Sequence, residues 1–190
     1  MLLLVGLGNP GSNYTNTRHN IGFKIIDAIN SHFKLSKQKP KFKGLLTTGN
    51  IEEKKIYAIK PLTFMNNSGT AIKELIDYFK IEAKDVIVFH DDMDIDFGKV
   101  KAKIGGSSAG HNGIESIDKF IGKDYSRVRI GIGHPKQKKK VNNHVLEDFK
   151  EDEEEKIKEI TENIVKQIPT LIDKKIDLFS SKVNQNLNGI

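Results

Sequence analysis

The sequence predicts a single-domain α/β protein: a mixed, mostly parallel, twisted sheet with helices on both faces. Three observations support this fold class. Short apolar runs alternate with segments of helical periodicity, two neighbouring runs have the spacing of a hairpin, and residues 86–89 form the continuous apolar run of a buried central strand. The chain has 190 residues, 37% of them hydrophobic, which is enough for one well-buried core. We expect one domain over residues 1–190, with C-terminal helices from about residue 151.

The first strand is predicted at residues 2–5, an apolar run that leads into a Gly and Asn turn. A polar segment without helical period follows. A helix of about three turns then begins, because apolar residues recur on one face at Ile21, Ile25, Ile26, Ile29 and Phe33. Open α/β sheets bind ligands beyond the carboxyl ends of their strands, so Asn9 and His19 lie where such a fold places its chemistry.

The next elements are a hairpin and a second helix. Residues 45–51 and 55–59 are rich in β-formers and are separated by a short charged turn, which favours an antiparallel pair. The helix that follows has Asn67 or Ser68 as its expected cap. Asn66 therefore precedes a helix directly.

Polar residues follow the predicted central strand as His90-Asp91-Asp92-Met93-Asp94, at its carboxyl end. A glycine-rich loop, Gly105–Gly110, separates two of the later elements, which are predicted at residues 100–104, 114–121 and 127–132. From Glu151 the acidic stretch EDEEE suits a helix N-terminus. We expect Pro169 to kink this amphipathic helix, the chain end to fray, and the helix to pack on the body rather than form a lid.

Composition restricts the classes of function. The net charge of +6 suggests a polyanionic partner without naming it, because a solvated basic surface gives the same count. The chain has no cysteine, which excludes disulfides and thiolate metal sites or nucleophiles. Residues 2–5 are too short for a signal peptide, and no apolar run approaches membrane-spanning length. We expect a cytoplasmic protein without membrane contact.

The run Gly6-Leu7-Gly8-Asn9-Pro10-Gly11 follows a strand and matches the pattern G-x-G-x-x-G of dinucleotide-binding proteins. In such proteins the last glycine already lies in a helix with an apolar face, whereas residues 12–20 offer only Tyr14 as a large apolar side chain. No acidic residue closes a second strand at the required distance. A plain turn is the better interpretation, and we expect no nicotinamide or flavin cofactor.

Four aspartates gather after the central strand: Asp91, Asp92, Asp94 and Asp96. Clustered carboxylates suit Mg²⁺ or Ca²⁺, but Phe97 and Gly98 stand where further ligands should follow. A solvated acidic turn is a second interpretation, although it does not explain why the cluster follows a buried strand. The third interpretation is that one carboxylate orients a histidine.

His19 beside an aspartate would form a general base with its orienting carboxylate, although His19 could equally cap its helix. Asn9, Asn66 and Asn112 all occur at the ends of predicted elements. Asparagine is both a donor and an acceptor without charge, which suits the recognition of amide and ester groups. Asparagine also favours turns and caps, so these residues alone leave both interpretations open.

Five runs in order carry a resemblance: GLGNPGSNYTNTRHN, KPLTFMNNSG, HDDMDIDFGK, GGSSAGHNG and RVRIGIGHP. They resemble the successive signatures of bacterial-type peptidyl-tRNA hydrolase, with the same order and spacing. The resemblance extends to about Phe149, and beyond it the helices agree only in general character. It implies cleavage of the ester between a peptide and the terminal ribose of tRNA, which recycles tRNA from prematurely released peptidyl-tRNA.

The resemblance also implies roles for individual residues. His19 would be the general base that activates water, Asp91 would hold its imidazole in the basic tautomer, and Asn9 would distinguish a blocked from an unblocked aminoacyl end. Four side chains would line the cleft for the 3′ end and the peptide: Tyr14, Phe64, Asn66 and Asn112. Two would clamp the 5′ phosphate: Lys103 and Arg129. We expect a monomer that needs no metal and no cofactor.

The sequence also predicts roles for two loops and leaves two rival functions open. Lys136–Lys140 would add positive charge for the RNA, and Gly105–Gly110 would be a mobile gate beside the cleft. A non-catalytic RNA-binding protein on the same scaffold is the alternative, but such a module needs the lysines and not the base. A dinucleotide-dependent oxidoreductase is the third possibility.

Overall fold

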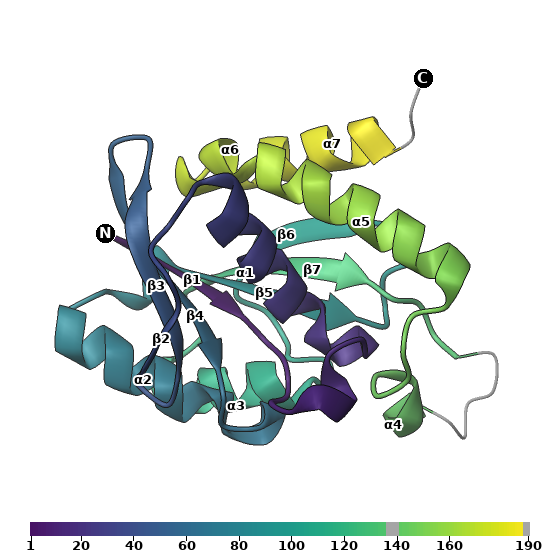
Figure 1. The fold of residues 1–190 in the computed structure, drawn as a ribbon, viewed down its shortest axis with the longest axis horizontal. Coiled ribbons are helices and arrows are strands. Elements are labelled where there is room, and N and C mark those ends of the chain that lie inside the picture. Colours follow the sequence, from purple (N-terminus) through teal and green to yellow (C-terminus); the bar gives the residue numbers. More distant parts are fainter. Residues whose placement is uncertain (136–140, 188–190) are drawn as a thin grey trace.

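The computed structural model describes residues 1–135 and 141–187 (Figure 1), so the Lys136–Lys140 segment lies outside the described residues. Within this part of the chain, seven strands form one sheet in the order β2-β3-β4-β1-β5-β7-β6. The strands are β1 (Leu2–Gly6), β2 (Lys39–Lys41), β3 (Gly44–Ile51), β4 (Lys54–Pro61), β5 (Val86–Asp92), β6 (Val100–Ile104) and β7 (Ser126–Gly131).

The four central strands, β4, β1, β5 and β7, are parallel to one another. The outer strands β2, β3 and β6 pair antiparallel with their neighbours, and β3 and β4 form the predicted hairpin. The prediction of a mixed sheet with a parallel centre is confirmed. Because the central strands are parallel, their carboxyl ends meet at one edge of the sheet, where the polar loops gather.

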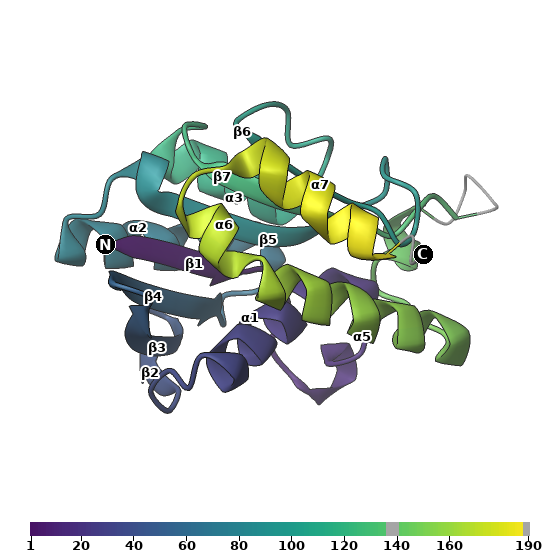
Figure 2. The same ribbon diagram turned by 90° about the horizontal axis from the view of Figure 1, so that it is seen from above.

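Helices cover both faces of the sheet, as predicted (Figures 1 and 2). The α-helices are α1 (Ile21–His32), α2 (Ser68–Phe79), α3 (Asn112–Ile121), α4 (Val141–His144), α5 (Glu151–Lys166), α6 (Ile168–Ile172) and α7 (Ile176–Leu187). Short 3₁₀ turns lie between elements: η1 (Ser12–Tyr14), η2 (Arg18–Asn20), η3 (Met65–Asn67) and η4 (Ala83–Asp85). None of the helices in the described ranges is long and apolar enough to cross a bilayer.

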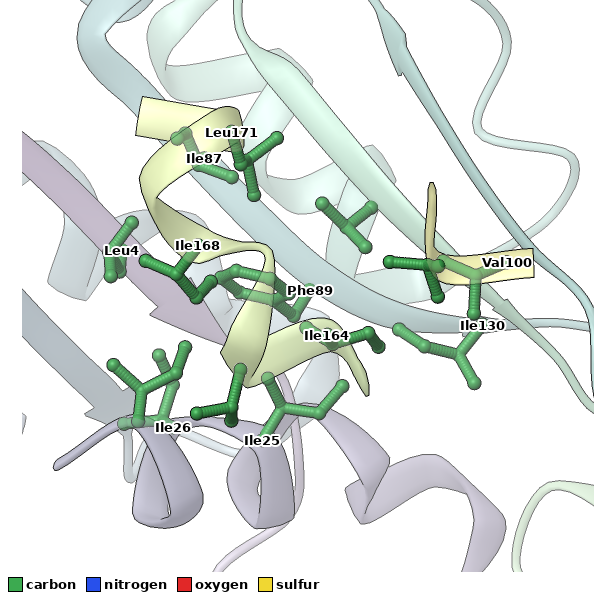
Figure 3. Close-up of a cluster of buried hydrophobic side chains, with 14 of the residues drawn as sticks. Leu4, Ile25, Ile26, Ile87, Phe89, Val100, Ile130, Ile164, Ile168 and Leu171 are labelled. Atoms are coloured by element: carbon green, nitrogen blue, oxygen red, sulfur yellow. The ribbon is translucent and has the colours of Figure 1, made fainter. Parts of the chain in front are cut away.

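Successive residues of a strand point to opposite faces, which divides the core into two layers. Leu2 and Leu4 of β1 pack with α1 and the C-terminal helices, whereas Leu3 and Val5 pack with α2 and α3. Figure 3 shows the first layer, in which side chains from α1, α5 and α6 meet those of the sheet around Phe89. Burial of both faces explains the continuous apolar runs of the central strands.

The C-terminal helices differ in detail from the prediction. The chain changes direction at Gln167, between α5 and α6, so Pro169 lies in the first turn of α6, where its missing N–H costs little. Helix α7 continues to Leu187, and the last three residues, where the chain end was expected to fray, lie outside the described residues. Its Asn184 side chain bonds both backbone groups of Val100, at 3.0 and 2.7 Å, and thereby covers the outer edge of β6. The tail packs on the body, as expected.

Candidate active site

A cleft of about 820 Å³ opens at the carboxyl edge of the sheet. Six predicted site residues line it: Asn9, His19, Phe64, Asn66, Asp91 and Asn112. They come from the ends of β1 and β5, from η2, from the segment before α2 and from the start of α3. Val145 and Leu146, in the segment after α4, also line the cleft. Tyr14, Lys103 and Arg129 lie outside this lining.

Asp91 lies inside β5 rather than in a turn after it. The strand continues through Asp92, three residues beyond the predicted apolar run, because His90, Asp91 and Asp92 pair with β7. Asp91 is 2% exposed. A buried carboxylate needs donors, and here they are two histidine rings.

His19 approaches Asp91 from η2, just before α1. Its Nδ1 lies 2.9 Å from each carboxylate oxygen of Asp91, and its backbone N–H donates to the carbonyl of Val145 at 2.8 Å. A proton on Nδ1 suits the carboxylate and leaves Nε2 as the basic nitrogen. Burial lowers the pKa of His19, but the charge and hydrogen bond of Asp91 outweigh it, so the pKa lies above the ordinary 6.5.

His111 is a second partner of Asp91, and it was not among the residues predicted from the sequence. Its Nε2 lies 3.0 Å from Asp91 Oδ1, while its Nδ1 accepts the backbone N–H groups of Gly113 and Ile114 at 3.1 and 3.3 Å. Since Nδ1 accepts, the proton must be on Nε2, where it donates to Asp91. His111 stands directly before the predicted Asn112, and its position as the cap of α3 was the available signal.

The two histidines outweigh the effect of burial on Asp91. Burial raises the pKa of this carboxyl group, but His19 and His111 hold it well below its usual range.

A third ring, His90, donates from Nδ1 to the backbone carbonyl of Asp91 at 2.8 Å, and its Nε2 is unpaired among the described residues. Burial, followed by the neighbouring His111, lowers the pKa of His90 far below 6.5, so its ring is neutral.

The arrangement of donors argues against a metal ion at this cluster. His19, Asp91 and His111 offer ligand atoms that lie within 4.8 Å of one another. Coordination through His111 Nε2 would move its proton to Nδ1, where two backbone N–H groups already donate. The expectation of a metal-free site remains a prediction, but this geometry suits hydrogen bonding better than coordination.

Asn9 is held with its amide in one orientation. Its Oδ1 accepts the backbone N–H of Met65 at 2.8 Å, which leaves the Nδ2 group to donate elsewhere. Asn20, which was not predicted as a site residue, bonds both backbone groups of Asn9, at 2.8 and 2.9 Å. Asn66 and Asn112 are exposed within the cleft lining. The cleft lining therefore contains three neutral amides together with His19.

The expected cap of α2 is only partly right. Asn67 occupies the cap position, but its side chain makes no capping hydrogen bond.

Ahead of Asn67, Phe64 is 54% exposed at the cleft rim and meets Tyr14 edge to face, with ring centroids 6.5 Å apart. These two aromatic side chains are together although 50 residues separate them in the sequence, and they form an apolar surface beside the asparagines.

Arg18 fastens the loop of His19 to the chain between α4 and α5 and to the start of α5. The Arg18 guanidinium donates to the carbonyls of Glu147 and Asp148 at 3.2 and 3.0 Å and to Glu153 at 2.7 Å. Its side chain is 3% exposed. Nothing in the local sequence pattern distinguished this buried arginine, because its partners lie about 130 residues away.

Lys103 and Arg129 lie on a different face from His19. Arg129 Nε donates to Asp92 Oδ2 at 2.8 Å, and Lys103 lies opposite Arg127 in the pairing of β6 with β7. Burial, then the charges of Arg129 and Arg127, lower the pKa of Lys103. Asp92 does line the cleft, so it connects the cleft to this cationic cluster.

The glycine-rich loop is anchored at two points. Gly105 N–H donates to the carbonyl of Tyr125 at 3.1 Å, and Arg127 Nη1 donates to the carbonyl of Ser107 at 3.0 Å. Residues 108–110 contribute to the cleft wall. The hypothesis that Gly105–Gly110 opens as a gate stays a prediction.

Comparison with known proteins gives consistent matches. The family model described as peptidyl-tRNA hydrolase matches residues 3–189. The chain is 73% identical over 184 residues to the peptidyl-tRNA hydrolase of Pelagibacter ubique, covering 97% of this chain and 99% of that protein. It is 46% identical over 189 residues to that of Bartonella henselae, with 100% and 98% covered. The crystal structure of peptidyl-tRNA hydrolase from Acinetobacter baumannii matches with a TM-score of 0.90 at 34% identity, with 97% and 94% covered.

Proposed function

Because the chain belongs to the peptidyl-tRNA hydrolase family, we propose that it hydrolyses the ester between the peptide and the 3′ ribose of tRNA with His19 as the general base. One observation carries this proposal: His19 Nδ1 lies 2.9 Å from both oxygens of Asp91, on the wall of a large cleft. The activity would recycle tRNA from peptidyl-tRNA that ribosomes release prematurely.

The reaction needs no covalent intermediate on the protein. His19 Nε2 takes a proton from water as the water oxygen attacks the ester carbonyl, and Asp91 stabilises the imidazolium that forms. The tetrahedral intermediate then loses the ribose oxygen, which receives the proton from His19. The products are a peptide carboxylic acid and tRNA with a free 3′-terminal hydroxyl group. An aminoacyl ester is already reactive, so an oriented water and hydrogen-bond donors suffice.

The three asparagines suit the features that all substrates share. Side chains of the peptide vary, so recognition must use the backbone amide and the RNA. Asn9 Nδ2 is free to donate because Met65 N–H occupies its Oδ1, and a donor there favours an amide carbonyl over the ammonium group of an unblocked end. Asn66 and Asn112 would hydrogen-bond the ester and peptide groups in the cleft.

The rim and the cationic cluster would bind the RNA part. Phe64 and Tyr14 offer aromatic surface for a terminal base, and Lys103 and Arg129 supply positive charge for the 5′ phosphate. The Lys136–Lys140 segment lies outside the described residues, so its role rests on its sequence alone. The cytoplasmic location and the monomeric state expected from the sequence also remain predictions.

The test is release of the N-blocked amino acid from N-acylaminoacyl-tRNA in EDTA, with unblocked aminoacyl-tRNA as the control substrate. We expect cleavage of the blocked substrate only. His19→Ala should lower turnover by about 10²–10⁴-fold and leave tRNA affinity nearly unchanged. Binding of tRNA without cleavage by the unaltered protein would favour a non-catalytic RNA-binding module. Equal losses of turnover and binding in His19→Ala would make His19 structural.

A further inference from the structure

Asp92 is a buried carboxylate that the hydrolytic mechanism does not use. It follows Asp91 directly in β5, but strand alternation directs its side chain to the other face of the sheet. Asp92 is 8% exposed. Its Oδ1 accepts the backbone N–H of Asp94 at 2.9 Å, and its Oδ2 accepts Arg129 Nε at 2.8 Å. Both oxygens are therefore held in fixed positions.

This contact constrains the Arg129 guanidinium, which is planar. A fixed acceptor at Nε sets the direction of that plane, and the two Nη groups remain on the far side of the guanidinium from Nε. The Arg129 side chain is 19% exposed, so part of it reaches the surface. An anion that meets the Nη groups finds them already oriented, which reduces the entropy lost on binding.

Charge alone does not explain a carboxylate at this position. A phosphate that approaches Arg129 and Lys103 is repelled by Asp92, so Asp92 weakens general attraction to RNA. The neighbouring Arg127 does not need Asp92, because it pairs with Asp118 at 2.8 Å. Besides its hydrogen bond with the backbone N–H of Asp94, orientation of Arg129 is the contribution that remains.

We propose that Asp92 is a positioning residue for phosphate recognition, holding Arg129 so that its Nη groups meet the 5′-terminal phosphate of tRNA. It lowers general affinity for RNA and raises selectivity for a phosphate at one place. This inference rests on the proposed function, in which Arg129 binds that phosphate. Asp92 also lines the cleft, so it lies between the reacting ester and the phosphate site.

The experiment compares kcat/KM for N-acylaminoacyl-tRNA that carries a 5′ phosphate with the same substrate that ends in a 5′ hydroxyl group. The key variant is Asp92→Asn, in which one of the two accepting oxygens is replaced by an amide group that donates, so one of the contacts to Asp94 and Arg129 loses its acceptor. Asp96→Asn is the control, since it removes the same charge from an exposed position in the turn after β5. Thermal melting checks that each variant is folded.

We expect the unaltered protein to prefer the 5′-phosphorylated substrate by about tenfold or more, the value of one charged hydrogen bond. Asp92→Asn should lose most of this preference although its total affinity for tRNA is equal or higher. Arg129→Ala should lose the preference, and adding Asp92→Asn to it should change nothing further. Asp96→Asn should retain the preference.

Two results would overturn the inference while leaving Arg129 in its role. One is an undiminished preference in Asp92→Asn when Arg129→Ala has lost it. The other is an equal loss of the preference in Asp92→Asn and Asp96→Asn, which would show that the removed charge, and not the orientation of Arg129, causes the effect. If the unaltered protein cleaves both substrates equally well, the phosphate role of Arg129 is wrong and the inference fails with it, whereas the assignment of ester hydrolysis stands.

Discussion

Asp91 and Asp92 are consecutive residues of β5, yet their surroundings differ completely. Asp91 receives hydrogen bonds from His19 and His111, and Asp92 receives one from Arg129. Histidine exchanges a proton near neutral pH, whereas arginine keeps its proton at all working pH values. The comparison shows that the donor beside a carboxylate determines what it can do. Asp91 can support proton transfer, and Asp92 can only orient a cation.

The largest effect should come from Asp91→Asn. We expect turnover to fall by about 10²–10⁴-fold, because the imidazolium formed on His19 loses its counter-charge. Affinity for tRNA should change little. Single-turnover cleavage and a separate binding measurement distinguish the two effects. A variant that is folded and cleaves at the normal rate would remove Asp91 from the mechanism.

A smaller loss is expected from His111→Asn, a substitution designed to keep the cap of α3. Asparagine caps helices well, so Gly113 and Ile114 retain an acceptor, but the shorter side chain cannot reach Asp91. Loss of one hydrogen bond to a charged group should lower turnover by roughly tenfold. Equal turnover would show that His111 serves only α3, and this result would leave Asp91 with a single essential partner.

Lys103→Ala should affect the cationic cluster beside Asp92 rather than the histidines beside Asp91. We expect weaker tRNA binding and a salt dependence reduced by about one unit in slope, with turnover at saturating tRNA unchanged. Lys84→Ala is the matched control, since Lys84 lies in η4, directly before β5 and at the opposite end of the strand from the cleft. An unaltered salt slope in Lys103→Ala would contradict a phosphate contact.

The smallest expected effect concerns stability and His90. The pKa of His90 in the folded protein lies well below 6.5, the ordinary value that it has in the unfolded chain. At pH values between these two pKa values, the unfolded chain binds a proton that the folded chain does not. The free energy of unfolding should fall as pH falls below 6.5, by up to about 1.4 kcal/mol per pH unit from this group. His19 has the opposite sign, because its raised pKa gives stability that is lost as pH rises through that pKa.

Denaturant unfolding of His90→Asn between pH 5 and 6.5 isolates this contribution, since asparagine can still donate to the carbonyl of Asp91. The pH dependence should be shallower than in the unaltered protein. The exposed His32 provides the control variant, His32→Asn, which should keep the original slope. If His90→Asn keeps it too, His90 is protonated in the folded state.

Local patterns in the sequence predicted most of the fold. The helical period from Ile21 and the apolar run of residues 86–89 each report the burial of a single element, which is a local property. The rule that chemistry gathers at strand ends placed Asn9, His19 and Asp91 at one edge, and the structure brings all three to one cleft. That they act together remains part of the proposal.

The partners that hold these residues could not be predicted in the same way. Asn20 and Arg18 flank His19, but their hydrogen bonds go to groups 11 and about 130 residues away, and no local periodicity encodes such pairs. The contact of His111 with Asp91 depends on how α3 sits against β5. The course of α7 was missed because two bonds from its Asn184 to Val100 stabilise a segment of weak helical signal.

The most direct test of the central claim is the pH dependence of kcat/KM, measured beside an NMR titration of the His19 ring. A general base must be neutral, so activity should rise with pH through a midpoint above 6.5 that coincides with the titration of His19. In Asp91→Asn both midpoints should move to lower pH, because burial then acts on His19 without the opposing charge. An activity midpoint that does not follow the titration of His19 in both proteins would contradict its role as the base.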